Sequence, residues 1–237
     1  MKVKRTAYAM KLAKPQVDIG LSTNDPDPML AFWQNTVGLR LDHVLPIRRG
    51  QNQHRHDAMG SVVKINHHAD PLPDAAPSGY RELIIARPGC TAPQTLHDPD
   101  GNRVGFVPPG HDGIRQIGIR VAVRDLDAHR RFYRDALGLA EEARPSSVAF
   151  RAGETLIMLE QDRHASLDAG IRGKGWRYIT FQVFRVDEVH AEVLAAGGRE
   201  ARAPVTLGTT ARISMVLDPD GNWIELSQRA SIVGALA

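Results

Sequence analysis

Alternating apolar and polar residues recur along the chain, each time followed by a short helical pattern. The segments 18–39 and 118–139 align without gaps and share a strand pattern, an aspartate and an aromatic pair. The alternation is typical of a half-buried strand, and the aspartate (Asp25 or Asp125) lies where a helix N-cap is expected. A glycine after the aromatic pair marks the end of each helix. The pattern therefore predicts a repeated strand–helix unit.

Two further copies of this unit can be recognised. One begins at Tyr178, and the segment 79–89 matches the start of that copy but has no helix after it. Only 23 residues separate Glu82 from Gly105, against 47 between Tyr178 and Glu225 at the matching positions. We therefore expect the second unit to lack its helix, between about residues 88 and 94.

A five-residue turn also occurs twice. Asp-Pro-Asp-Gly-Asn stands at residues 98–102 and again at 218–222, where it is expected to join the last two strands of each half. The fold class predicted is α+β, with tandem strand–helix–three-strand (βαβββ) units that form two curved, cup-like sheets. The expected boundaries are an N-terminal arm (1–16), an N-terminal module (17–109), a linker (110–114), a C-terminal module (115–229) and a tail (230–237).

The composition excludes some classes of function. The net charge is only +3, the basic residues are spread along the chain, and just 13 residues are aromatic, which disfavours nucleic acid as a partner. No apolar run is long enough to span a membrane, and the single cysteine cannot form an internal disulfide, so we expect a cytoplasmic protein. Arginine outnumbers lysine 24 to 6. This excess reflects either a general compositional bias or several arginines that bind an anionic substrate.

The strand followed by "FYRDALGL" (residues 132–139) and the two Asp-Pro-Asp-Gly-Asn turns resemble the vicinal oxygen chelate superfamily. This superfamily includes glyoxalase I, bleomycin-resistance proteins and extradiol dioxygenases, and the resemblance covers about residues 17–108 and 115–228. It implies a divalent metal in the cup that holds two neighbouring oxygens of a substrate. Because the superfamily hosts lyases, isomerases, oxygenases and binding proteins, the resemblance does not select one activity.

The resemblance also implies three ligand positions in each half: one on the first strand, one on the first strand of the next unit, and a glutamate after the turn. The C-terminal half has Gly118, Tyr178 and Glu225 at these positions, and the N-terminal half has Asp18, Glu82 and Gly105. Neither set is complete. Glu225 is interpreted as a metal ligand or general base, or else as a retained carboxylate in a wet cup, and Tyr178 as a hydrogen-bond donor to an oxyanion or as space-filling. Alternation places Gln182 and Trp223 on the same face as these two residues, as expected contacts of the substrate.

Histidines in the N-terminal half suggest a second arrangement. His54 and His56 have strand spacing, so both imidazoles share one face and Arg55 takes the other. With Asp18 and Glu82 expected in the same cup, this set would suit iron, manganese or zinc. A solvated hairpin without metal is the alternative. His129 and His190, in the first turns of their helices, are expected to be exposed.

Two functions follow as hypotheses. The first is a metal-dependent enzyme of lyase, isomerase or dioxygenase type that acts on a substrate with adjacent oxygens. The second is a non-catalytic protein that binds or sequesters a small molecule in one cup. The incomplete sets of metal-ligand positions favour the binding protein, and the histidine–carboxylate set favours the enzyme. In either case we expect a small-molecule ligand and no nucleic-acid or membrane partner. A homodimer is one of the assemblies considered.

Overall fold

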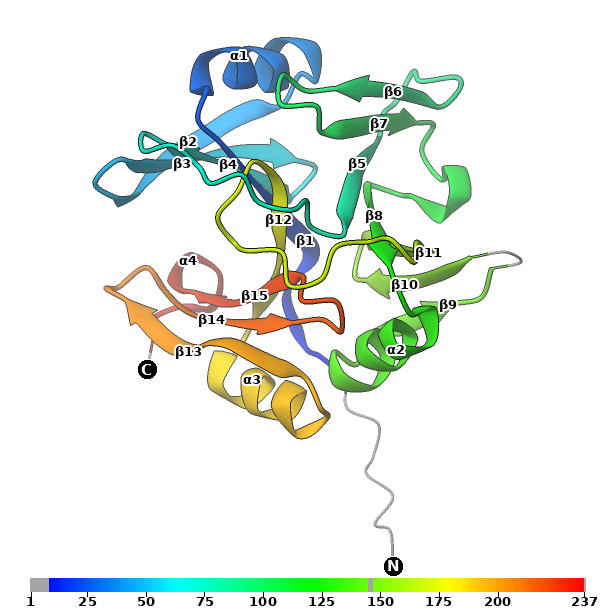
Figure 1. The fold of residues 1–237 in the computed structure, drawn as a ribbon, viewed down its shortest axis with the longest axis vertical. Helices are drawn as coiled ribbons and strands as arrows, with labels where there is room; N and C mark the ends of the chain where they lie inside the picture. The colour runs from blue at the N-terminus through cyan, green and yellow to red at the C-terminus, as the bar shows by residue number, and fades with distance from the viewer. Residues whose placement is uncertain (1–8, 145–146, 237) are drawn as a thin grey trace, which may run out of the picture.

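Two curved sheets make up most of the protein, whose computed structural model describes residues 9–144 and 147–236. The eight-stranded sheet has the order β13-β14-β15-β12-β1-β4-β3-β2, and the seven-stranded sheet has the order β6-β7-β5-β8-β11-β10-β9 (Figure 1). The strands of the first sheet are β1 (Leu12–Thr23), β2 (Arg40–Arg48), β3 (Gln51–Ala58), β4 (Ser61–His68), β12 (Gly175–Val183), β13 (Arg199–Leu207), β14 (Ala211–Leu217) and β15 (Trp223–Arg229). Those of the second are β5 (Tyr80–Ala86), β6 (Gln94–His97), β7 (Arg103–Val107), β8 (Ile117–Val123), β9 (Ala140–Glu142), β10 (Val148–Ala152) and β11 (Thr155–Gln161).

Each sheet combines one repeat unit from each half of the chain. Strand β1 pairs antiparallel with β12, and β5 pairs antiparallel with β8. The first and fourth units therefore build the eight-stranded sheet, and the second and third build the other. The two sequence modules do not correspond to the two sheets, because the central pairing of each sheet, β1 with β12 and β5 with β8, joins a strand of the first half to a strand of the second half.

The helices follow the predicted repeat. They are α1 (Pro26–Ala31) continued by a π-helical turn (Phe32–Thr36), α2 (Leu126–Arg131) continued by another (Phe132–Ala136), α3 (Val186–Ala195) and the short α4 (Ala230–Val233). In the second unit the chain runs from β5 to β6 through turns and bends, which confirms the missing helix. Its Asp-Pro-Asp-Gly-Asn turn joins β6 to β7, and the other copy joins β14 to β15, as expected.

Regular structure occurs in two of the expected connecting segments. Strand β1 begins at Leu12, so the last part of the predicted arm belongs to the sheet, and residues 1–8 lie outside the described part of the chain. The linker 110–114 contains a short 3₁₀ turn, His111–Gly113. The prediction that the two helix histidines are exposed is wrong. His129 is fully buried beside Asp218 of the second Asp-Pro-Asp-Gly-Asn turn. His190 of α3 is also buried and bonds Ser214 and Glu200.

One continuous apolar core covers the helix-facing sides of both sheets. Alternation puts Ile19, Ile179 and Ile224 on this side, where each is inaccessible to solvent. Members from α1, α2 and α3 pack into the same cluster. Burial of this much apolar surface is the main source of stability expected for such a fold. It leaves the opposite face of each sheet to form a cup.

The cup of the seven-stranded sheet is filled by its own side chains. A second apolar cluster occupies it, consisting of Ile84, Ala86, Val107, Ile114, Ala149, Leu156 and Met158. A Cβ atom on Gly118 would lie 2.9 Å from Met158 Cε and 3.0 Å from Ile114 Cδ1, so side chains press directly on this backbone. Glu82, on the same face, bonds Arg120 at 2.8 Å. The cup that can receive a ligand is therefore the one in the eight-stranded sheet.

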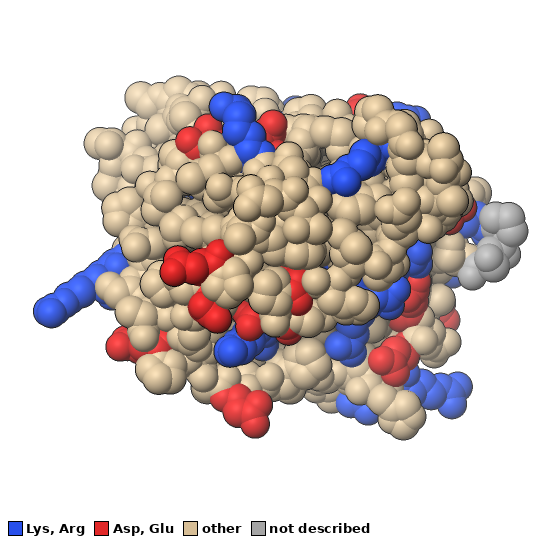
Figure 2. Space-filling view, turned by 90° about the horizontal axis from the view of Figure 1, so that it is seen from above, with Lys and Arg blue, Asp and Glu red and all other residues tan. Residues whose placement is uncertain are grey.

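The outer surface has a mixed charge. On the face shown in Figure 2, basic and acidic side chains lie interspersed among uncharged residues. Within the described residues, no helix is long and apolar enough to cross a membrane. The only cysteine of the sequence, Cys90, is a half-buried free thiol.

Candidate functional site

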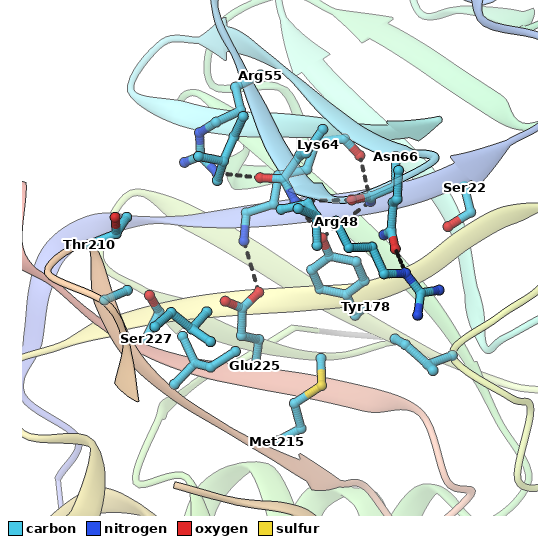
Figure 3. Close-up of a pocket in the computed structure, with 18 of the residues that line it drawn as sticks. Ser22, Arg48, Arg55, Lys64, Asn66, Tyr178, Thr210, Met215, Glu225 and Ser227 are labelled. Atoms are coloured by element: carbon cyan, nitrogen blue, oxygen red, sulfur yellow. Dashed lines mark hydrogen bonds and ion pairs between the residues drawn. The ribbon is translucent and has the colours of Figure 1, made fainter. Parts of the chain in front are cut away.

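The eight-stranded sheet encloses a cavity of about 570 Å³ on its polar face. This volume lies in the range of sites for small organic ligands. Its walls come from strands of both outer units and from the loop before β12, which adds Ile171 and Arg172. The apolar part of the lining consists of Leu45, Pro46, Ile47, Ile171, Leu207, Ala211, Ile213 and Met215. The cavity therefore offers an apolar surface beside a polar floor (Figure 3).

Positive charge dominates the polar part of the lining. Among the described residues, the lining contains one carboxylate, that of Glu225, and six basic side chains: Arg48, Arg55, Lys64, Arg172, Arg202 and Arg229. Charges of one sign in a concave site of low dielectric raise the local concentration of ligands of the opposite sign. The lining is therefore electrostatically suited to an anion.

Lys64 occupies the centre of the polar floor. Its ammonium is only 3% exposed and donates hydrogen bonds to Thr180 Oγ1 at 2.6 Å and to Glu225 Oε2 at 2.9 Å. Thr180 in turn donates to the same Glu225 oxygen. Figure 3 shows Lys64 and Glu225 reaching toward each other across the cavity. Burial lowers the pKa of Lys64, and the charges of Glu225 and Asp18 act in the opposite direction.

Tyr178 lies beside this pair on β12. Its ring is 5.2 Å from the Lys64 ammonium, and its hydroxyl oxygen accepts hydrogen bonds from Gln53 and Asn66, each at 3.2 Å. Burial raises the pKa of the phenol, so the hydroxyl keeps its proton at neutral pH. Both neighbours use it as an acceptor, which leaves its own proton free for a third partner.

Arg55 is a buried cation in the wall without an acidic partner. Its side chain is 5% exposed, and Nη1 donates to Gln53 Oε1 at 2.6 Å. Among the described residues no carboxylate lies within ion-pair distance of it, and Nε has no hydrogen-bond partner. The buried Oε1 atom of Gln182, another wall residue, likewise has none. Buried polar groups without a hydrogen-bond partner are energetically costly.

The predicted substrate-side residues are only partly brought together. Glu225, Tyr178 and Gln182 line the cavity, as alternation along β12 and β15 predicted. Trp223 does not belong to the lining, because its indole N–H donates to Ala169 O at 2.9 Å and fixes the loop before β12. Its expected contact with substrate is therefore replaced by a structural one.

The predicted metal ligands do not share one face of one sheet. Asp18 and Glu82 belong to different sheets, because β1 pairs with β12 and β5 with β8. Asp18 is fully buried and accepts from Lys14, from Val62 N at 2.9 Å and from Gln182 at 3.0 Å. Although burial alone would raise the pKa of Asp18, the nearby lysines lower it. Both carboxylates are thus neutralised by basic groups of the protein itself.

The two histidines of the predicted metal set face away from the cup. His54 and His56 are paired across β3–β4 with Ile65 and Val63, which are core residues on the helix side. His56 Nε2 lies 3.3 Å from Gln34 in the π-helical turn after α1, and burial lowers the pKa of this histidine to about 4. The expectation that both imidazoles share a face was right, but Arg55 is the residue that enters the cup. Within the described residues, no group of three or more histidine, cysteine, aspartate or glutamate side chains has an arrangement that could hold a metal ion.

The residues at the position where the resemblance implies a divalent cation do not fit a divalent metal. Ile19 of β1 and Ile179 of β12 pair at the centre of the sheet and hold equivalent positions in the first and fourth units. The next residue on β1, Gly20, pairs with Lys64, and the next residue on β12, Thr180, pairs with Glu225. Lys64 therefore stands in the first unit where Glu225 stands in the fourth. A lysine ammonium cannot be a metal ligand, and here it bonds Glu225, the one carboxylate that the described residues contribute to the lining.

Sequence reasoning missed Lys64 and the role of Arg55. A signal for Lys64 was present, since 46 residues separate Asp18 from Lys64, close to the 47 between Tyr178 and Glu225. The first unit has Met59-Gly60 in place of the Asp-Pro-Asp-Gly-Asn turn, so the matching position was not recognised. Arg55 could be found only from the face that its strand presents to the cup.

Known proteins share this fold. The protein is similar to glyoxalase I from Zea mays, with 16% identity, 90% of this chain and 92% of that chain covered, and a TM-score of 0.71. It is similar to a putative dioxygenase from Bacillus subtilis subsp. subtilis str. 168, with 12% identity, coverage of 94% and 86%, and a TM-score of 0.67. These identities establish the fold alone. A search of curated proteins found no match.

The family relationship is carried by the C-terminal half. The model of the Glyoxalase/Bleomycin resistance protein/Dioxygenase superfamily matches residues 113–226. This segment includes the second strand–helix–strand signature and Glu225, and the pairing of the sheets extends the same architecture over the first half. Residues 113–226 therefore match the glyoxalase, bleomycin resistance protein and dioxygenase superfamily, and the fold of the described chain is similar to that of glyoxalase I.

Proposed function

We propose that this protein binds a small organic anion with an apolar body in the cup of the eight-stranded sheet. The observation that carries the proposal is Arg55, a guanidinium that is 5% exposed in the cavity wall and has no carboxylate partner among the described residues. A carboxylate or similar group of a ligand would supply the missing counter-charge for this guanidinium. The apolar lining would bury the remainder of such a ligand.

The free hydrogen-bonding groups support the same ligand class. Within the part of the chain that the structure describes, the Arg55 Nε–H and the Tyr178 hydroxyl proton have no acceptor, and Gln182 Oε1 has no donor. An anion needs donors, and an adjacent hydroxyl or amide of the ligand would bond Gln182. This arrangement favours the binding protein over the metal-dependent enzyme expected from the sequence, because that enzyme needs donors from Asp18, His54, His56 and Glu82, which lie on different faces and sheets.

The test uses two dyes that differ in charge. 1-Anilinonaphthalene-8-sulfonate is an amphipathic aromatic anion, and N-phenyl-1-naphthylamine is its neutral counterpart without the sulfonate. We expect one anionic dye to bind per chain, and Arg55→Met to weaken that binding at least about tenfold, since hydrogen bonds to charged groups contribute roughly 1.5–3 kcal/mol. The neutral dye should bind both proteins with equal affinity.

A control variant separates the cup from the general surface. Arg185 is 73% exposed next to α3, where it pairs with Glu188, so Arg185→Met removes one positive charge without touching the cavity. It should bind the anionic dye like the parent protein. Equal affinity of the parent for both dyes, or an Arg55→Met protein that binds the anion unchanged, would contradict the proposal.

A further inference from the structure

The cup contains its own cation at the place where a divalent metal is expected from the family resemblance. We propose that the Lys64 ammonium replaces this metal, so that the cup binds its ligand without a metal ion. Lys64 and Glu225 hold matching positions of the first and fourth units, as the parallel register of β1–β4 and β12–β15 shows. Two equivalent positions in the cup could each supply a carboxylate. In this protein one of them carries the Lys64 ammonium, and the other carries its counter-ion, the Glu225 carboxylate.

The charges around Lys64 are balanced in a way that opposes a metal. Its ammonium bonds Glu225 directly, and the buried Asp18 carboxylate lies close enough to interact with it electrostatically. A divalent ion on Glu225 would have to lie against a buried ammonium and near the guanidinium groups of Arg55 and Arg229, which interact with the same region. The positive charges of the metal ion, the ammonium and the guanidinium groups would repel one another strongly in this buried site of low dielectric. Occupation of this site by a metal would require Lys64 to leave.

The third N–H group of Lys64 gives the cation a role toward the ligand. An ammonium has three donors, and within the described residues two are used, by Thr180 and Glu225. The remaining donor belongs to a residue of the cavity lining. It can bond an oxygen of the ligand and stabilise negative charge there, as a metal would do by coordination. A point charge on a flexible stem suits this task, although it provides no fixed coordination geometry.

The assignment predicts that removal of the lysine should create a metal site. Lys64→Glu would place a second carboxylate opposite Glu225, with Asp18 nearby. We expect the parent protein to show no saturable Co²⁺ binding in the cup by isothermal titration calorimetry. We expect Lys64→Glu to bind one Co²⁺ per chain at least about a hundredfold more tightly than any residual binding by the parent, because affinity rises with the number of anionic ligands.

Further variants locate the gained site and guard against misfolding. The double variant Lys64→Glu, Glu225→Gln should lose most of the gained affinity, and thermal unfolding confirms that each protein is folded. Lys64→Gln, which removes the charge without adding a carboxylate, should gain less than Lys64→Glu and serves if the latter does not fold. Stoichiometric Co²⁺ binding by the parent that Glu225→Gln abolishes, or no gain in any folded Lys64 variant, would overturn the assignment. These metal titrations are independent of the dye experiment, so either proposal can fail alone.

Discussion

The Nζ atom of Lys64 lies 2.9 Å from the Oε2 atom of Glu225, although 161 residues separate them in the sequence. Their side chains are 3% and 14% exposed, and Thr180 bonds both. The contact joins β4 of the first unit to β12 and β15 of the fourth. It therefore fixes the floor of the cup and connects the two halves of the chain.

We expect this pair to behave as a buried ion pair in a double-mutant cycle. Glu225→Leu alone should lower the free energy of unfolding by about 3 kcal/mol, because it leaves the Lys64 ammonium buried without a counter-charge. The double variant Lys64→Met, Glu225→Leu should recover a large part of that loss, since neither charge then remains. Urea unfolding followed by tryptophan fluorescence measures each value.

A surface pair provides the comparison. Arg212 and Asp187 bond through two nitrogens, but their side chains are 27% and 58% exposed. Asp187→Asn should therefore cost less than about 1 kcal/mol. If Glu225→Leu costs no more than this surface variant, the buried pair does not stabilise the fold as described.

His129 should make the protein less stable as the pH rises above neutrality. Its Nε2 lies 3.4 Å from Asp218 Oδ2 and 3.7 Å from Asp220 Oδ2, within ion-pair range but without good hydrogen-bond alignment. Burial alone would lower the pKa of His129, but the two carboxylates raise it overall. A raised folded pKa gives stability that is complete below about pH 6.5 and is lost as the pH passes through the folded value.

The measurement compares the parent with His129→Gln between pH 5.5 and 9. The parent should lose its advantage in the free energy of unfolding toward the upper end of this window. An advantage that stays constant, or grows, with rising pH would show that His129 is neutral in the folded protein.

His56 should act in the opposite direction. Burial against the helix side lowers its pKa to about 4, so the folded state favours the neutral imidazole. Its contribution to stability is present above about pH 6.5 and is lost as the pH falls toward 4. His56→Gln should therefore show a weaker loss of stability across this range than the parent, whereas His43→Gln, at an exposed position, should match the parent. Identical acid profiles for the parent and His56→Gln would contradict the placement of this histidine.

Gly20 should be required for the position of the Tyr178 ring. A Cβ atom at Gly20 would lie 2.3 Å from Tyr178 Cε1, too close for the ring to remain. Gly20→Ala should cost about 1–3 kcal/mol and weaken anionic dye binding, because the hydroxyl would leave Gln53 and Asn66. Gly170→Ala, where the nearest atom is 3.6 Å away, serves as the control, and thermal unfolding with dye titration measures both. A Gly20→Ala protein that matches the control would mean that the ring has room to shift.

Local patterns predicted which face each strand residue takes, because side-chain direction alternates with a period of two. Glu225, Tyr178 and Gln182 reached the cup for this reason, and His54 and His56 share one face. The repeated turn and the shortened second unit were equally local. The fold class followed from these signals together with the family resemblance.

Long-range pairing could not be predicted in the same way. Nothing in the spacing of Asp18 and Glu82 shows that β1 pairs with β12 and β5 with β8, so the two carboxylates were expected in one cup. Nor does alternation show which face of β3 meets a helix. Charge alone favours an exposed arginine there, yet Arg55 is buried in the cup because that face is polar and concave. The ammonium of Lys64 became interpretable only once both units were seen side by side.

The exchange of units between the sheets has a consequence for any shortened version of this chain. Residues 9–109 alone would present β1 and β5 as unpaired edges, and residues 115–236 would present β12 and β8, each with a full row of free backbone groups. Such edges adhere to the nearest complementary strand. Separately produced halves should therefore reassemble with each other, or pair with copies of themselves, and neither would retain a cup with Lys64 facing Glu225.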